Sequence, residues 1–176
     1  MKKILFLLTL LSFQLFYSQG EINIFNFSSY DMHFTLLANN PGNTAGGCTP
    51  NLNTWGSPTV LSGNPVTGNP LTYTSYNNAL VQSPIVVSWS NGTQVYNAPG
   101  PHGILNVYSA STKWLGSKFS VNDPATGNGI PNGGFSIGGI GCGSSNVFVP
   151  NVGGTAPYPI FGQWFTVGSV TYFVIQ

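Results

Sequence analysis

One short motif in this chain has the residue types and spacing of a catalytic nucleophile. The residues Gly134-Phe135-Ser136-Ile137-Gly138 match the G-x-S-x-G turn that presents the serine of many hydrolases. That turn needs a helix directly after the serine, but the glycine-rich run from 138 to 143 cannot form one, and no histidine or acid follows Asp123. His102, Asp123 and Ser136 could still form a triad in another chain order, because a triad is defined by geometry. We expect a chance match in a chain rich in glycine and serine.

Acidic and metal-binding side chains are too few for the other common kinds of active site. Glycosidases need two carboxyl groups about 5 to 9.5 Å apart, whereas here Glu21 lies near the N-terminus and Asp31 and Asp123 lie in predicted turns. Asp31 and His33 would share one face of a strand, and with His102 they could bind a metal ion. We expect both aspartates to cap turns and both histidines to be ordinary surface or hydrogen-bonded residues. The sequence therefore predicts a non-catalytic protein without a metal site or a cofactor.

Charged residues make up only 4% of the chain, against about one quarter in an ordinary globular domain. After the first twenty residues the chain keeps two lysines, three acidic residues and no arginine, a net side-chain charge of −1. Binding to nucleic acid depends on the number of phosphates neutralised, so we exclude nucleic acid as a partner. Any partner must be recognised through neutral polar groups and aromatic rings.

Aromatic rings and neutral hydrogen-bonding side chains are abundant, and this combination suits a neutral saccharide. Rings can stack on the apolar faces of sugars while amides bond to hydroxyl groups. Most aromatic residues with strand-like spacing belong to a core, and we expect this of Trp89, which follows two valines. Trp55, Tyr76 and Trp114 lie nearer to turn signals. These three are therefore the predicted ligand-binding residues.

The first twenty residues have the pattern of a secretory signal peptide. Lys2 and Lys3 precede an apolar stretch, and Ser18 and Gly20 are small residues at the −3 and −1 positions of a cleavage site. The stretch is shorter than the ~20 apolar residues of a membrane-spanning helix, so we predict cleavage after residue 20 and no transmembrane segment afterwards. The segment resembles signal peptides of Gram-negative bacteria. Residues 21–176 would then form one secreted domain, either extracellular or periplasmic.

The chain contains two cysteines, Cys48 and Cys142. In an oxidising compartment they are predicted to form one disulfide bond, and neighbouring glycines allow the backbone to adapt. Two free thiols or two metal ligands are the alternatives, but the C-x-x-C spacing of zinc sites is absent.

The apolar residues alternate with a period of two, which indicates strands. Residues 22–27 and 32–38 are predicted to form an N-terminal hairpin. Asn91-Gly92 predicts a hairpin with a type I′ turn, and Gly168-Ser169 predicts a C-terminal hairpin with a type II′ turn. Residues 58–70 and 127–143 are expected to be long loops, and no segment predicts a helix. Further strands are expected at residues 60–61, 71–76, 104–110, 118–121, 135–140 and 146–149.

Many short strands separated by turn signals predict an all-β, single-domain antiparallel β-sandwich with long loops rich in Gly, Pro and Asn, with a barrel as the alternative. The predicted function is a secreted, non-catalytic binding module at or outside the bacterial cell surface, with a neutral glycan or a protein as its partner. One alternative is a structural subunit that self-assembles into homo-oligomers by strand pairing, since residues 170–175 are apolar on both faces. Another alternative is a secreted β-rich toxin.

Overall fold

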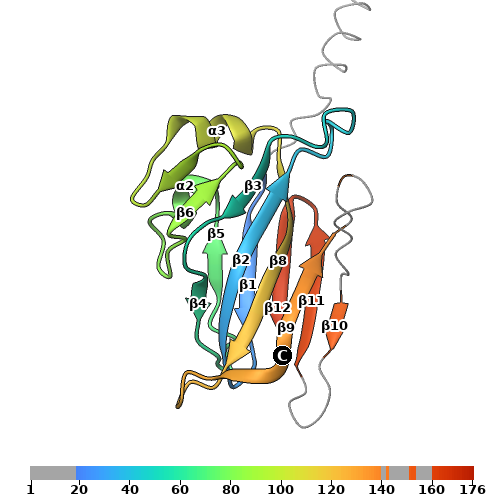
Figure 1. Cartoon of the computed structure of the whole chain (residues 1–176). Coiled ribbons are helices and arrows are strands. Elements are labelled where there is room, and N and C mark those ends of the chain that lie inside the picture. Colours follow the sequence, from blue (N-terminus) through green and yellow to red (C-terminus); the bar gives the residue numbers. More distant parts are fainter. Residues whose placement is uncertain (1–18, 140–141, 143–150, 154–159) are drawn as a thin grey trace, which may run out of the picture.

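A computed structural model of the chain describes residues 19–139, 142, 151–153 and 160–176 (Figure 1). Its strands form two separate sheets that pack face to face, which confirms the all-β sandwich over the closed alternative. The first sheet has the order β10-β11-β12-β1-β5. Its strands are β10 (Asn151–Gly153), β11 (Phe161–Val167), β12 (Val170–Ile175), β1 (Ile22–Asn26) and β5 (Leu71–Tyr73).

The second sheet has the order β7-β6-β3-β2-β8-β9, and β4 also pairs with β2. Its strands are β7 (Val95–Asn97), β6 (Ser88–Ser90), β3 (Asn51–Thr54), β2 (Asp31–Asn39), β8 (Lys113–Asn122), β9 (Gly129–Gly138) and β4 (Thr59–Leu61). Two short helices, α2 (Tyr76–Ala79) and α3 (Gly103–Ser109), lie on the side of the sandwich that carries β6 (Figure 1). No helix in the described ranges has the length and apolar character needed to cross a membrane.

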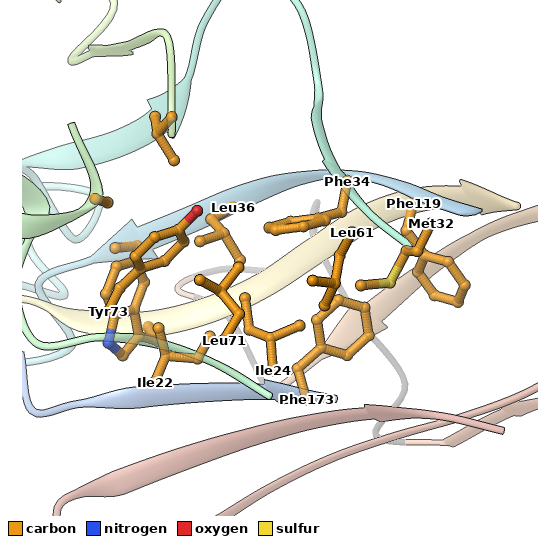
Figure 2. Close-up of a cluster of buried hydrophobic side chains, with 14 of the residues drawn as sticks. Ile22, Ile24, Met32, Phe34, Leu36, Leu61, Leu71, Tyr73, Phe119 and Phe173 are labelled. Atoms are coloured by element: carbon orange, nitrogen blue, oxygen red, sulfur yellow. The ribbon is translucent and has the colours of Figure 1, made fainter. Parts of the chain in front are cut away.

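The core lies between the two sheets and is formed by every second residue of the long strands. Ile22 and Ile24 on β1 point into it, as do Met32, Phe34 and Leu36 on β2 (Figure 2). The Phe173 ring of β12 meets the Phe34 ring edge-on at a centroid distance of 6.4 Å, which joins the two sheets. The predicted alternation of buried and exposed residues is therefore confirmed on both strands.

The predicted N-terminal hairpin is wrong, because β1 and β2 belong to different sheets. The chain crosses from one sheet to the other at residues 27–30, where the buried side chain of Asn26 holds the bend. Its amide nitrogen donates to the carbonyls of Tyr30 at 2.8 Å and Leu61 at 2.9 Å, and its oxygen accepts from the Ser28 hydroxyl at 2.6 Å. Both strands bury every second residue in the same core, but they do so from opposite sheets. The alternation in the sequence is therefore the same as in a hairpin.

Both hairpins predicted from turn residues are present. β11 and β12 are joined by Gly168-Ser169, and Gly168 has a φ of +63° while Ser169 does not have a positive φ, as a type II′ turn requires. β6 and β7 are joined by residues 91–94, and the predicted type I′ turn on Asn91-Gly92 is wrong there. Instead, Gly92 and Thr93 are the central residues, because Asn91 donates its backbone N–H to the Gln94 carbonyl.

Several other predictions need correction. Residues 104–110 lie largely in helix α3 and not in a strand. The strand expected at 135–140 is present as the end of β9, but β9 already begins at Gly129, so the described part of 127–143 is not the long loop that was expected. Glycine suits this strand because a Cβ atom on Gly133 would lie 2.7 Å from the Val121 side chain. Strands β3 and β10 were not predicted, and the strand expected at 146–149 lies outside the described residues.

Strand β12 has a partner on each side, antiparallel β11 and parallel β1. Its two apolar faces therefore reflect a central position in the sheet, and its edge is not available for pairing with another chain. This removes the argument from residues 170–175 for assembly by strand addition.

The folded domain includes Gln19 and Gly20, two residues that the predicted cleavage site assigns to the signal peptide. Gln19 donates its backbone N–H to the Ser109 carbonyl at 2.7 Å, and the Trp114 indole donates to the Gly20 carbonyl at 3.3 Å. The rest of the predicted signal peptide lies outside the described residues.

Candidate functional site

The three predicted ligand-binding rings do not share one environment. The Trp55 side chain is 58% exposed, whereas Tyr76 is 0% and Trp114 is 5% exposed, so the expected exposure of these two rings is wrong. Tyr76 and Trp114 pack around Trp89, which is buried as predicted, with ring centroids 4.8 to 5.9 Å apart. Burial raises the pKa of the Tyr76 hydroxyl well above its usual value, against a smaller opposing effect of its hydrogen bond with Thr112. Tyr76 and Trp114 are core residues.

Trp55 directly follows β3 and continues its alternation. Asn51 and Asn53 face the solvent with Trp55, while Leu52 and Thr54 face the core. The indole is 58% exposed and stacks on no other ring in the described part of the chain, so a large part of its surface is accessible to a ligand. Alternate residues on a strand are about 6.7 Å apart, and the indole and two amides thus form one row on the outer surface of the second sheet.

A cavity of about 340 Å³ opens on this surface beside the two asparagines. Strands β2, β3 and β8 supply its floor, and the loop that carries the disulfide supplies one wall. The lining residues are Leu37, Ala38, Asn39, Asn51, Leu52, Asn53, Leu115, Gly47 and Cys142. Leu37 lies opposite Asn53 in the β2–β3 pairing, so an aliphatic group and an amide adjoin at the cavity.

The amide groups of the cavity keep much of their hydrogen-bonding capacity. Asn51 donates one side-chain N–H to the Gly47 carbonyl at 3.2 Å, and Asn53 donates one to the Thr54 carbonyl at 3.2 Å. The Asn39 side chain, although only 6% exposed, makes no hydrogen bond with any described residue. An amide offers two donors and one acceptor oxygen, so a ligand in the cavity would meet several unused groups.

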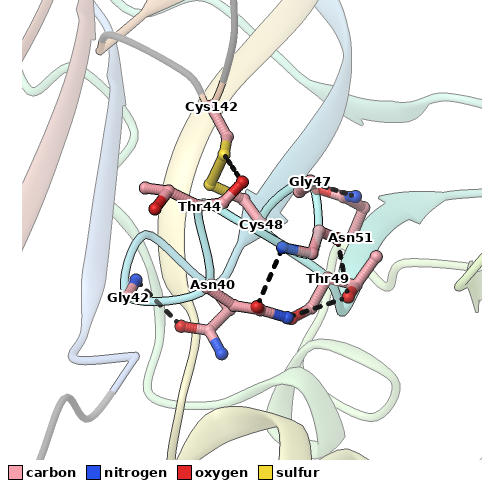
Figure 3. The surroundings of a disulfide bond; sticks show 10 residues. Asn40, Gly42, Thr44, Gly47, Cys48, Thr49, Asn51 and Cys142 are labelled. Atoms are coloured by element: carbon pink, nitrogen blue, oxygen red, sulfur yellow. Dashed lines mark hydrogen bonds between the residues drawn. A yellow bond between two sulfur atoms is a disulfide. The ribbon is translucent and has the colours of Figure 1, made fainter.

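The disulfide between Cys48 and Cys142 is formed as predicted, with the two Cα atoms 5.6 Å apart (Figure 3). The loop before it is tied by backbone bonds from Asn40 N–H to the Cys48 carbonyl at 2.9 Å and from Cys48 N–H to the Asn43 carbonyl at 2.7 Å. Gly47 and Cys142 both line the cavity. The disulfide therefore fixes a wall of the candidate site as well as the fold.

None of the described residues that line the cavity has an ionisable side chain. A ligand there would be recognised by neutral amides and by aliphatic contact alone. A second cavity, of about 360 Å³, is lined by Leu80, Val81, Ile85, Ala98 and Pro99. It lacks polar side chains among these residues, so it offers little basis for specific recognition of a polar ligand.

The residues considered for a catalytic triad lie on different elements, and of those considered for metal binding Asp31 and His33 share β2 while His102 lies at the start of α3. Ser136 is an exposed residue of β9, and His102 is at the start of α3, where its Nε2 atom lies 2.7 Å from the Asn97 carbonyl. Asp123 caps a turn as predicted, because its carboxylate accepts from the Ala125 N–H at 2.8 Å. Asp31 is the first residue of β2 and not part of a turn. The described residues contain no group of three His, Cys, Asp or Glu side chains that could hold a metal ion.

A second exposed surface, not predicted from the sequence, lies on the outer side of the first sheet. We call it the aromatic face, and its residues are Phe25, Phe27, Phe161, Phe165, Val167, Tyr172 and Val174. The Phe165 and Tyr172 rings are stacked across β11 and β12 at 5.1 Å, and Phe25 and Phe27 are stacked along β1 at 5.9 Å. The sequence of β11 could have predicted this surface, because Phe161, Phe165 and Val167 alternate with the buried Trp164 and so lie on the opposite, outer face of the strand.

A β-sandwich can carry many unrelated functions, so the function has to be argued from the sites themselves. The candidate site is the cavity beside Asn39, Asn51 and Asn53 together with the Trp55 indole. No protein-family model, no curated protein and no solved structure matches this chain.

Proposed function

We propose that this protein is an exported, non-catalytic binding module that acts at or outside the bacterial surface and binds a neutral glycan. The observation that carries the proposal is the composition of the candidate site. Three asparagines and three leucines line a cavity without an ionisable group, and an exposed indole lies on the same side of β3 as two of these asparagines. This is the set of groups that uncharged, hydroxyl-rich rings require.

The two parts of the site have different tasks in this proposal. The Trp55 indole stacks on the apolar face of one sugar ring, and the amides of Asn51 and Asn53 bond to hydroxyl groups further along the strand. Leu37 and Leu115 contact the C–H groups of a ring that enters the cavity. Hydrolysis of a glycosidic bond requires a carboxyl group as acid, and none lines the described cavity, so the bound glycan is released unchanged.

The aromatic face is less suited to sugars, although it has more rings. The planes of Phe165 and Tyr172 are 9° apart, and those of Phe25 and Phe27 are 8° apart. A ring that stacks on a neighbour has part of one face covered, whereas a sugar stacks on a free ring face. Trp55 has no ring neighbour among the described residues, and unlike the exposed Phe161 it lies on the same side of a strand as the asparagines of the cavity.

A glycan array with the purified protein tests the proposal, followed by calorimetric titration of any neutral oligosaccharide that is retained. We expect binding by the wild type, and loss of most of it for Trp55→Ala and for Asn53→Ala. Phe161→Ala is the matched control, because it removes an aromatic ring of similar exposure (50%) outside the site and should bind normally. Absence of binding to every neutral glycan at millimolar concentration would reject the proposal, as would unchanged affinity of Trp55→Ala.

The aromatic face favours a second candidate function, assembly with a second copy of the same chain. The residues of the face lie on β1, β12 and β11 and directly after β1, so the face is small. Two copies would bury less than the roughly 1,000 Å² that a stable interface exceeds, which fits a weak dimer. The seven residues of the face carry no charge, so pairing with an identical face leaves no charge buried without a partner.

Sedimentation velocity over a range of protein concentrations tests this second candidate. We expect a weak dimer that Phe165→Asp abolishes, because the new carboxylate would be buried in the contact. Trp55→Asp is the control on the other sheet and should leave the dimer intact. A monomer at all concentrations up to the solubility limit rules out assembly through this face.

A further inference from the structure

Gln19 is buried in the folded domain, although it lies beside the predicted cleavage site. Its side chain is 3% exposed, and it contacts Ser109, the last residue of α3. The backbone N–H of Gln19 donates to the Ser109 carbonyl at 2.7 Å, and the Ser109 hydroxyl donates to the Gln19 side-chain oxygen at 2.8 Å. The side-chain nitrogen, Nε2, is buried and has no hydrogen-bond partner in the structure as described.

Gly20 is fitted to its surroundings as closely as Gln19. Its φ is +70°, and a Cβ atom at this position would lie 1.9 Å from the Ser169 carbonyl oxygen. Its own carbonyl accepts the indole N–H of Trp114, a core residue. Cleavage after Gly20 would remove the acceptor for Trp114 and the two groups of Gln19 that bond to Ser109, and would leave the Ser109 hydroxyl with the Leu105 carbonyl at 2.9 Å.

From these contacts we propose that the leader is removed between Ser18 and Gln19, and that Gln19, as the new N-terminal residue, becomes a pyroglutamate seated against Ser109. This cut keeps a small residue, Ser18, directly before the cleaved bond, while Phe16 replaces a small residue at the −3 position. The proposal depends on the proposed export of the chain and is independent of the nature of the ligand.

The covalent change is balanced and needs no oxidant or reductant. Hydrolysis of the Ser18–Gln19 peptide bond by a peptidase consumes one water and frees the α-amine of Gln19. The amine nitrogen then attacks the side-chain amide carbon, so a bond from the α-nitrogen to Cδ forms and the bond from Cδ to Nε2 breaks. Nε2 departs as ammonia, taking the proton that the amine loses. The product is a five-membered lactam with one N–H and one carbonyl oxygen.

The contacts of Gln19 match the product better than the open side chain. The lactam keeps the backbone N–H and the side-chain oxygen, which are the two groups that already bond to Ser109. It loses Nε2, which is the polar side-chain atom without a partner. An open N-terminus would also place a charged ammonium in this closed position, where the described hydrogen bonds of Gln19 include no carboxylate. The lactam is neutral.

Mass spectrometry of the full chain, expressed with its own leader in a secreting Gram-negative host, tests the proposal. We expect the N-terminal peptide of the exported protein to begin at residue 19 and to be lighter than the encoded peptide by one ammonia. After unfolding, a pyroglutamyl aminopeptidase should remove this residue and expose Gly20. An N-terminus at Glu21, an N-terminus before residue 19, or Gln19 with a free amine each overturns the proposal.

Two variants test whether the lactam, once formed, stabilises the fold through its contacts with Ser109. Gln19→Ala cannot cyclise, and Gln19→Glu keeps the side-chain oxygen but closes far more slowly. We expect both exported variants to carry a free α-amine and to melt at a lower temperature than the wild type. Equal melting temperatures for all three proteins would show that the site does not favour the lactam. These measurements do not involve a glycan, so they can succeed or fail independently of the binding proposal.

Discussion

The backbone N–H of Trp55 donates to the Ser88 carbonyl at 2.8 Å, and the Ser88 hydroxyl donates to the Trp55 carbonyl at 2.7 Å. These two bonds position the backbone of Trp55 at the end of β3 without using its indole. The ring is thereby held in place on one side of the sheet while contributing little to the fold. A role of this kind can be separated experimentally from a role in stability.

We expect Trp55→Ala to change the free energy of unfolding by less than about 0.5 kcal/mol, as is usual for an exposed position. Trp114→Ala should lower it by about 3 to 5 kcal/mol, because this ring is buried against Tyr76 and Trp89. Urea denaturation followed by fluorescence measures both values. A large loss of stability in Trp55→Ala would mean that its ring is a structural element.

Glycan binding should be nearly independent of pH and salt. The described cavity residues include no ionisable side chain, so there is no charge to titrate or to screen. Between low salt and about 1 M salt, where the Debye length falls to about 3 Å, we expect affinity to change by less than about twofold. Titration calorimetry at several pH values and salt concentrations measures this. A steep salt dependence would point to lysines outside the cavity as contacts.

Removal of the Cys48–Cys142 disulfide should reduce both stability and binding. The bond closes a loop with a sequence separation of 94, and the chain-entropy model gives about 4 to 5 kcal/mol for a loop of this size. Because Gly47 and Cys142 line the cavity, the double variant Cys48→Ser, Cys142→Ser should also lose affinity under conditions in which it is still folded. Unchanged affinity in the folded variant would place the glycan away from this wall.

Gly20→Ala should be one of the most damaging single substitutions in the chain. It adds a Cβ atom at a φ of +70° and within 1.9 Å of the Ser169 carbonyl oxygen. Gly168→Ala is the matched control, because its φ is +63° and no atom lies within 4 Å of the added Cβ. We expect the control to lose about 1 kcal/mol from backbone strain alone and Gly20→Ala to lose at least about twice as much. Thermal unfolding of the two variants compares them directly.

Ser117→Ala should stabilise the protein. The Ser117 hydroxyl is fully buried in the core and has no hydrogen-bond partner among the described residues, and such a group costs about 1 kcal/mol or more. Ser28→Ala is the opposite case, since the Ser28 hydroxyl is buried but bonds to the Asn26 side chain at 2.6 Å and accepts from the Tyr30 N–H at 3.2 Å. We expect it to lower stability by about 1 to 2 kcal/mol. Chemical denaturation should therefore shift in opposite directions for the two serines.

The sequence predicted the parts of the fold that local chemistry decides. A period-two pattern marks strands such as β2, and the dipeptide Gly168-Ser169 determines a two-residue turn, so both were identified correctly. The pairing of β1 with β12 was not predictable in this way, because it joins the two ends of the domain. The alternation in residues 22–38 fits either a hairpin or a crossing between two sheets. The hydrogen bonds of Asn26 to Tyr30, Leu61 and Ser28 stabilise the crossing, and they are visible only in the structure.

The candidate site was predicted in part. Trp55 was identified because it lies next to turn residues, and the same argument failed for Tyr76 and Trp114, which lie near turns but close the core around Trp89. The cavity could not be predicted, because Asn39, Asn51 and Asn53 come together only when β2 and β3 pair and the disulfide loop folds beside them. The alternation along β11 marks one row of the aromatic face, but the stacking of Phe165 on Tyr172 depends on the pairing of β11 with β12.

The parallel pairing of β1 with β12 imposes an order of events on folding. The first strand of the domain has no neighbour on that side until almost the whole chain has been made and, if the protein is exported, has passed through the secretion machinery. The first sheet must therefore close late, and a chain truncated before β12 would leave both β1 and β11 with a bare edge. Premature folding during transport is thereby discouraged by the topology itself.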